Sequence, residues 1–156
     1  MIRNKAIFLA DNHYHVYNHA IASENFFKHP DNYNYFIEKF HDYLRPYVHL
    51  EGYCLLPNHF HLLIRVKPFH IDPLEVNRIT LKAFSDFHNC YTKSINVRYK
   101  RKGRLFQSPL LRIYLPNQVD VEKVAKYIYE NPVEHGFCKA PDEWLHSRMK
   151  SELLAA

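Results

Sequence analysis

The run from Leu55 to Ile64 constrains the fold more than any other part of this 156-residue chain. Pro57 and Asn58 suit a tight turn, because proline presets φ and asparagine tolerates unusual backbone angles. After the turn, side chains alternate as in a strand, with His59, His61 and Leu63 on one face and Phe60, Leu62 and Ile64 on the other. The run therefore predicts an antiparallel hairpin with one apolar face and one face that carries two imidazoles.

Hydrophobic spacing predicts the remaining elements. They are a strand over 13–21, a helix over 30–43, the hairpin strands from 48 to 56 and from 59, a helix from Pro73 to about Tyr99, a strand over 105–114 interrupted at Pro109, a helix over 116–131 that ends before Pro132, and a short helix in the tail. The order β, α, β, β, α, β, α predicts an α+β, ferredoxin-like fold: a mainly antiparallel sheet with helices packed on one face. The other face, with the histidines, would be left for a partner.

Composition is consistent with one folded domain over 1–156, with 140–156 as its C-terminal tail. Hydrophobic residues make up 47% of the chain, which argues against disorder. No apolar run is long enough for a membrane helix or a convincing signal peptide, so we expect a cytoplasmic protein with no membrane partner. Three widely separated cysteines exclude a disulfide framework and a thiolate zinc site, and we expect them to be buried and reduced.

The pair His59 and His61 could form half of a metal site. Side chains at i and i+2 on a strand point the same way, so two ring nitrogens can converge on one cation. The alternative is that both are polar residues on the wet face of an amphipathic strand. His13, His15 and His19 include the same i, i+2 spacing, but no partner motif accompanies them, and we interpret them as surface residues.

Tyr127 and Asn131 lie one turn apart on the last long helix, at the edge of its apolar stripe. They could be a packing residue and a helix cap. They could also complete the site: His59, His61 and the Asn131 amide oxygen would hold a divalent ion, and Tyr127 would supply an attacking oxygen. A phenol is a weak nucleophile at neutral pH and needs a nearby cation or base to attack a phosphodiester.

Two motifs carry a resemblance to a known family. The sequence LPNHFHLLI at 56–64, followed by YIYENPVEHG at 127–136, resembles the single-tyrosine HUH transposases, and especially the REP-associated tyrosine transposases of the IS200-like group. The segments 14–16, 91–96 and 102–107 are similar as well, so the resemblance covers most of the chain. Glu134-His135 and the segment 144–148 depart from the family pattern, which puts DNA contacts in question more than catalysis.

The resemblance implies cleavage and rejoining of single-stranded DNA near hairpins without ATP. Tyr127 would form a 5′-phosphotyrosine link and release a 3′-hydroxyl, while His59, His61 and Asn131 would hold Mg²⁺ or Mn²⁺. Because imidazoles suit Mn²⁺ better than Mg²⁺, the identity of the ion stays open. The protein would act at the nucleoid in the cytoplasm. It could be a monomer or a homodimer, and Tyr127 could complete the metal site of its own chain or that of a twofold partner.

A net charge of +5 and a basic run at 98–104 make an anionic partner plausible. The expected DNA contacts are Arg98, Lys100, Arg101, Lys102, Arg104, Gln107 and Arg112. Tyr99, Phe106 and Tyr114 could stack on unpaired bases or pack in the core. Two other functions stay open: a domesticated, non-catalytic protein that binds DNA hairpins, and a metal hydrolase that needs no covalent step.

Overall fold

A computed structural model describes residues 4–68 and 71–155. The predicted domain of 1–156 thus extends beyond the described residues at both ends. The elements are β1 (His13–His19), α1 (Pro30–Leu44), β2 (Val48–Leu56), β3 (His59–Val66), α2 (Pro73–Tyr99), β4 (Leu111–Leu115), α3 (Gln118–Glu134), the 3₁₀ turn η1 (Pro141–Glu143), β5 (Ser147–Met149) and the 3₁₀ turn η2 (Ser151–Leu153).

Within the described residues, five antiparallel strands form one sheet in the order β4-β1-β3-β2-β5. The predicted hairpin is confirmed: β2 and β3 pair across the Pro57-Asn58 turn, with Leu56 opposite His59. Strand β3 lies at the centre, and β1 pairs along its other edge with His19 opposite His59 and Tyr17 opposite His61. The order β4-β1-β3-β2 over the first six elements confirms the α+β, ferredoxin-like prediction.

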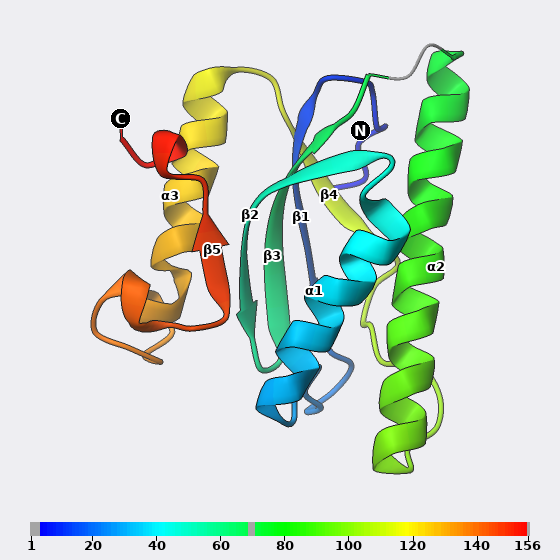
Figure 1. Cartoon of the computed structure of the whole chain (residues 1–156), viewed down its shortest axis with the longest axis vertical. Coiled ribbons are helices and arrows are strands. Elements are labelled where there is room, and N and C mark those ends of the chain that lie inside the picture. The colour runs from blue at the N-terminus through cyan, green and yellow to red at the C-terminus, as the bar shows by residue number, and fades with distance from the viewer. Residues whose placement is uncertain (1–3, 69–70, 156) are drawn as a thin grey trace.

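The two faces of the sheet carry separate cores, because successive strand residues point to opposite sides. Phe60, Leu62 and Ile64 belong to the larger core beneath α1 and α2. Leu63, between them, belongs to a second core with Val121, Ala125 and Ile128 of α3. Figure 1 shows α3 on the opposite side of the sheet from α1 and α2. The prediction that helices pack on one face is therefore wrong for α3, which covers part of the face that carries the histidines.

Helix ends follow local sequence signals, with one exception. Asp72 caps α2 by accepting from the Leu74 N–H at 2.8 Å, with Pro73 in the first turn. The predicted end of α3 before Pro132 is wrong, because the helix continues to Glu134. Proline has the φ that a helix needs, and in the last turn its missing N–H removes a single backbone bond. Asn131 is thus held in regular helix.

The C-terminal segment also differs from the prediction. It forms β5, which pairs with the outer edge of β2, between two 3₁₀ turns. The side chain of Trp144 donates to the Leu55 carbonyl at 3.0 Å and anchors the segment. All three cysteines are free, but of these only Cys54 is fully buried. Among the described residues, no helix has the length and apolar character needed to cross a bilayer.

Candidate metal and nucleophile site

The site lies between β3 and α3. His59 and His61 are each 6% exposed, and their ring centroids are 5.4 Å apart with the planes nearly perpendicular. They share the face that α3 covers, because Leu63, two residues further along β3, packs against that helix. The two imidazoles are therefore neighbours on one face, and that face is covered by α3 instead of being wet.

Tyr127 approaches this pair from α3 of the same chain. Its ring centroid is 5.5 Å from that of His61 and 6.0 Å from that of His15. The side chain is 43% exposed, so the phenol borders both the imidazoles and solvent. Of the two interpretations of Tyr127, the contact with His61 favours a position beside the site over one in the core.

Asn131 lies one helical turn after Tyr127 and is fully buried. Its carboxamide faces His59 and raises the pKa of that imidazole. This contribution is smaller than the effects of burial and of the neighbouring histidines, which lower the pKa. Among the residues that the structure describes, neither its oxygen nor its nitrogen has a hydrogen-bond partner of good geometry. A buried amide without a hydrogen-bond partner costs about 1–3 kcal/mol of stability. A purely structural role for Asn131 would therefore require a hydrogen bond that offsets this cost. A cation beside the imidazoles would satisfy the oxygen.

Burial keeps both histidines neutral. It lowers the pKa of His59 to about 4, with smaller contributions from His19 and His135. It lowers the pKa of His61 to about 2, with further lowering by His15. Because a neutral imidazole keeps a lone pair on one nitrogen, both rings are available as metal ligands at neutral pH.

The donor atoms at this site fit a divalent ion only if the side-chain amide of Asn131 is one of the ligands. Among residues 4–68 and 71–155, no three His, Cys, Asp or Glu side chains are arranged to hold a metal ion. Two imidazoles and the Asn131 oxygen would leave coordination positions open for water or a phosphate, as catalytic metal sites require. Nitrogen donors suit Mn²⁺ better than Mg²⁺.

Three further histidines surround the pair, and sequence reasoning missed their role. The Nε2 atom of His15 is 2.9 Å from Nδ1 of His61. The His19 ring stacks on His59 at 4.9 Å, and the His135 ring meets His59 edge-on at 4.8 Å. Interpreting His15 as a surface residue was therefore wrong, because its side chain is 7% exposed, whereas His19 is exposed and still stacks on His59. Their alternation along β1 was visible, but only the β1–β3 register shows that it faces the β3 pair.

His135 follows from the geometry of α3. It lies four residues after Asn131, so the two residues and Tyr127 form one stripe along the helix. Glu134-His135 was expected to lie outside the chemistry. The position of its ring against His59 corrects that expectation for His135.

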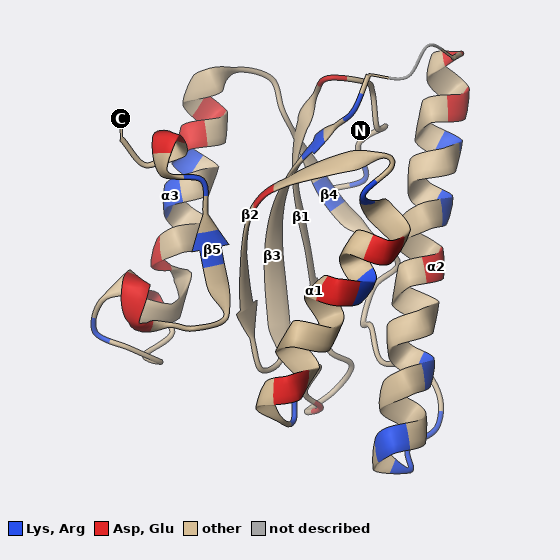
Figure 2. Cartoon of the chain, in the orientation of Figure 1, with Lys and Arg blue, Asp and Glu red and all other residues tan. Residues whose placement is uncertain are grey.

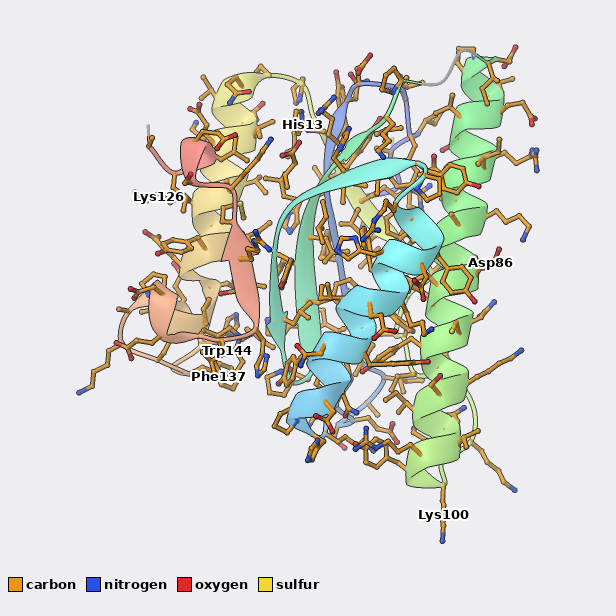
Figure 3. All side chains as sticks on the ribbon, in the orientation of Figure 1. His13, Asp86, Lys100, Lys126, Phe137 and Trp144 are labelled. Carbon is orange, nitrogen blue, oxygen red and sulfur yellow. The ribbon has the colours of Figure 1, made fainter. Side chains whose placement is uncertain are left out.

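The basic segment reaches the same end of the sheet. Gln107 donates its backbone N–H to the carbonyl of His19, and Ala20 donates to that of Asn58, both at 2.8 Å. These bonds place the segment between the basic loop and β4 beside the hairpin turn that precedes His59; the predicted strand over 105–114 forms only as β4, Leu111–Leu115. Figure 2 shows Lys and Arg gathered at the lower end of α2 and the loop after it, and Figure 3 shows Lys100 extending away from this end.

The predicted DNA contacts divide into two groups. Exposed side chains, which an anionic ligand could reach, are those of Arg98, Lys100, Lys102, Arg104 and Gln107. Arg101 instead pairs with Glu24 at 2.7 Å, and Arg112 donates to the Ala6 and Leu110 carbonyls at 2.8 Å. These two guanidinium groups hold the fold together.

The aromatic candidates divide as well. Phe106 is 6% exposed and stacks on the buried His88 ring at 4.0 Å, so it belongs to the core. Tyr99 is half-buried, and its hydroxyl contacts the Asn32 side chain at 3.0 Å. Tyr114 is 42% exposed. Of the three, Tyr114 has the most open ring for a base.

Together, the sheet order and the site define a class: a ferredoxin-like α+β domain with a histidine pair on its central strand and a tyrosine-bearing helix laid across it. A solved structure of a REP-associated tyrosine transposase bound to a REP hairpin has the same fold. It superposes with a TM-score of 0.69 at 18% identity, over 94% of this chain and 82% of the other.

A curated relative agrees in sequence. A protein of Haemophilus influenzae, provisionally named a REP-associated tyrosine transposase, is 26% identical over 105 residues, which are 65% of this chain. The match spans 59% of that relative's length. No protein-family model matches the chain. The two comparisons confirm the resemblance to REP-associated tyrosine transposases that the motifs indicated.

Proposed function

We propose that this chain is a metal-dependent enzyme that cuts and rejoins single-stranded DNA at hairpin-associated sites, in transposition or in the processing of REP elements. One observation carries the proposal. On a single helix, the Tyr127 ring contacts His61, and the Asn131 amide, which has no hydrogen-bond partner of good geometry among the described residues, faces His59. A packing role would explain neither the unpaired amide nor the half-exposed phenol beside two neutral imidazoles.

The chemistry follows from the positions of these groups. The Tyr127 oxygen attacks the phosphorus of a DNA backbone linkage, and the bond from phosphorus to the 3′ oxygen breaks. The products are a 5′-phosphotyrosine and a strand with a free 3′-hydroxyl; the phenol loses a proton and the 3′ oxygen gains one. Attack by a 3′-hydroxyl on the phosphotyrosine reverses these steps and rejoins DNA without ATP. The covalent link conserves the energy of the broken bond.

His59, His61 and Asn131 would hold the ion, with Mg²⁺ and Mn²⁺ as the candidates. When bound, it would polarise the phosphate and offset the charge that develops on it. The protein residues orient these parts: α3 brings the phenol to the imidazoles, and the sheet keeps both imidazoles on one face. The exposed cations from Arg98 to Arg104 would contact backbone phosphates of the hairpin or its single-stranded flank.

The remaining assignments belong to the same proposal. The chain would act as one HUH-type domain, in the cytoplasm at the nucleoid. Because Tyr127 and the histidine pair come from one chain, a single copy could complete the site, and a homodimer would be an additional assembly instead of a requirement.

The test uses labelled single-stranded DNA hairpins with short flanks, incubated with the full chain and Mn²⁺ and separated on denaturing gels. We expect a covalent protein–DNA adduct with the wild type and none with Tyr127→Phe. The matched control is Tyr129→Phe on the same helix, which should keep the adduct. Because Tyr127 is half-exposed, its hydroxyl should matter little for folding, and thermal unfolding should be unchanged.

Other outcomes identify the alternatives. An adduct that persists in Tyr127→Phe would overturn the nucleophile assignment. Hairpin binding by the wild type without any adduct would indicate a non-catalytic hairpin-binding protein. Cleavage that needs Mn²⁺ and survives the loss of Tyr127 would indicate a hydrolase that activates water.

A further inference from the structure

Both candidate ligand histidines have their Nδ1 atom engaged by another side chain. Nδ1 of His59 is 2.8 Å from Oδ1 of Asn58, and Nδ1 of His61 is 2.9 Å from Nε2 of His15. By elimination, each ring has only Nε2 left for a ligand. The two contacts use unrelated parts of the fold: the hairpin turn supplies Asn58, and β1 supplies His15.

The Asn58 contact determines where His59 carries its proton. A carboxamide oxygen can only accept a hydrogen bond, so Nδ1 of His59 must be the donor. A neutral imidazole with its proton on Nδ1 has its lone pair on Nε2. The residue that closes the hairpin turn thus prepares the adjacent histidine for coordination through Nε2.

The His15 contact has two possible protonation arrangements, and one of them is compatible with coordination. If Nε2 of His15 donated to His61, the proton of the His61 ring would lie on Nε2 and block that atom. If Nδ1 of His61 donates, the lone pair of Nε2 is free, and His15 carries its own proton on Nδ1. Both rings are buried, at 7% and 6% exposure, so water does not compete for this hydrogen bond.

We propose that Asn58 and His15 are positioning residues that hold His59 and His61 in the tautomer with Nδ1 protonated, so that both Nε2 lone pairs face one divalent cation. The proposal rests on the metal site of the proposed function. Groups that orient metal ligands in this way change metal affinity about 10–100-fold when they are removed. His15 should have the larger effect, because its bond is fully buried and Asn58 lies in an exposed turn.

Long-range proton–nitrogen NMR spectra of the full chain, labelled with ¹⁵N and free of metal and DNA, test the tautomers directly. At neutral pH we expect both His59 and His61 to carry the ring proton on Nδ1. In Asn58→Leu the His59 ring, and in His15→Phe the His61 ring, should shift toward protonation on Nε2. The Mn²⁺ affinity, measured by calorimetry, should fall about 10–100-fold in His15→Phe and by less in Asn58→Leu.

Two further variants separate positioning from general damage. Asn58→Asp keeps an acceptor oxygen and should keep both the His59 tautomer and the Mn²⁺ affinity. His13→Phe changes the histidine two residues before His15 on β1, which is labelled in Figure 3 and whose ring lies 3.9 Å from Glu51, and should leave both unchanged. If His15→Phe fails to fold, Asn58→Leu and Asn58→Asp still test the proposal. Both variants keep the hydrogen bond from the Ala20 N–H, because its acceptor is the backbone carbonyl of Asn58.

The proposal is overturned if wild-type His59 and His61 carry their protons on Nε2, or if His15→Phe and Asn58→Leu bind Mn²⁺ as tightly as the wild type. Its failure is distinguishable from that of the proposed function. Tyr127→Phe should abolish adducts while leaving the tautomers and the Mn²⁺ affinity unchanged. A wild type that binds no Mn²⁺ at all would refute the metal site, and the positioning role with it.

Discussion

Replacing Asn131 with leucine should stabilise the metal-free protein while removing its ability to bind metal. Leucine has the same branching at Cγ as asparagine but no polar atoms. Asn131 is fully buried, and neither polar atom of its side chain has a hydrogen-bond partner of good geometry in 4–68 or 71–155. Residues that serve a site at the expense of stability are expected where activity needs a strained or unsatisfied group.

The size of the effect follows from the unpaired amide. A buried polar group without a partner costs about 1–3 kcal/mol, and leucine is also the better helix former by a few tenths of a kcal/mol. The free energy of unfolding of Asn131→Leu should therefore exceed that of the wild type by about 1–3 kcal/mol. For a domain of this size, the Tm should rise by about 2–12 °C.

Mn²⁺ should stabilise the wild type and leave the stability of Asn131→Leu unchanged. At an ion concentration about 100 times the Kd, binding adds about 2.7 kcal/mol to the stability of the wild type and nothing to that of a variant that cannot bind. Urea unfolding with EDTA and with Mn²⁺ measures all four free energies. The prediction is a gain from the substitution in EDTA and a metal-dependent shift in the wild type alone.

Asn32 is the matched control. It is 1% exposed, but its Oδ1 accepts from the N–H groups of Lys28 and His29 and contacts the hydroxyl of Tyr99. Asn32→Leu should therefore destabilise the protein in EDTA and leave the Mn²⁺ shift intact. The reasoning about Asn131 is refuted if Asn131→Leu is less stable than the wild type in EDTA, or if it keeps the full Mn²⁺ shift.

Two further predictions concern pH and DNA. Burial lowers the pKa of His88 from 6.5 to about 3, so the unfolded chain takes up this proton first and stability falls as pH drops from 6.5 toward 3. His88→Phe should reduce that loss by roughly 1 kcal/mol per pH unit, and an unchanged pH profile of urea unfolding would contradict it. Lys100→Gln with Lys102→Gln should flatten the log–log salt dependence of hairpin binding by about 0.7 per lost contact. Arg101→Gln should instead lower stability, because Arg101 pairs with Glu24. An unchanged salt slope in the double lysine variant, or an unchanged Tm in Arg101→Gln, would refute the assignment of these residues to DNA contact and to folding, respectively.

Local sequence signals determined the kind and order of most elements. The turn at Pro57-Asn58 and the alternation after it predicted the β2–β3 hairpin, and Asp72 with Pro73 predicted the start of α2. These signals succeed because turn chemistry, capping and periodicity act between residues that are close in sequence. They also suggested His59, His61, Tyr127 and Asn131 as candidates, although not their contact.

Only the tertiary structure decided which elements pack together and which side chains face one another. The face that α3 covers depends on which apolar stripe packs against which side of the sheet, and periodicity alone leaves both sides open. The place of His15 beside His61 depends on the β1–β3 register, in which a shift by one residue would turn β1 over. The place of His135 against His59 depends on α3 continuing through Pro132. The sequence by itself therefore determined most of the elements and the candidate residues, whereas pairing and packing across long separations brought five histidines, Tyr127 and Asn131 into one cluster.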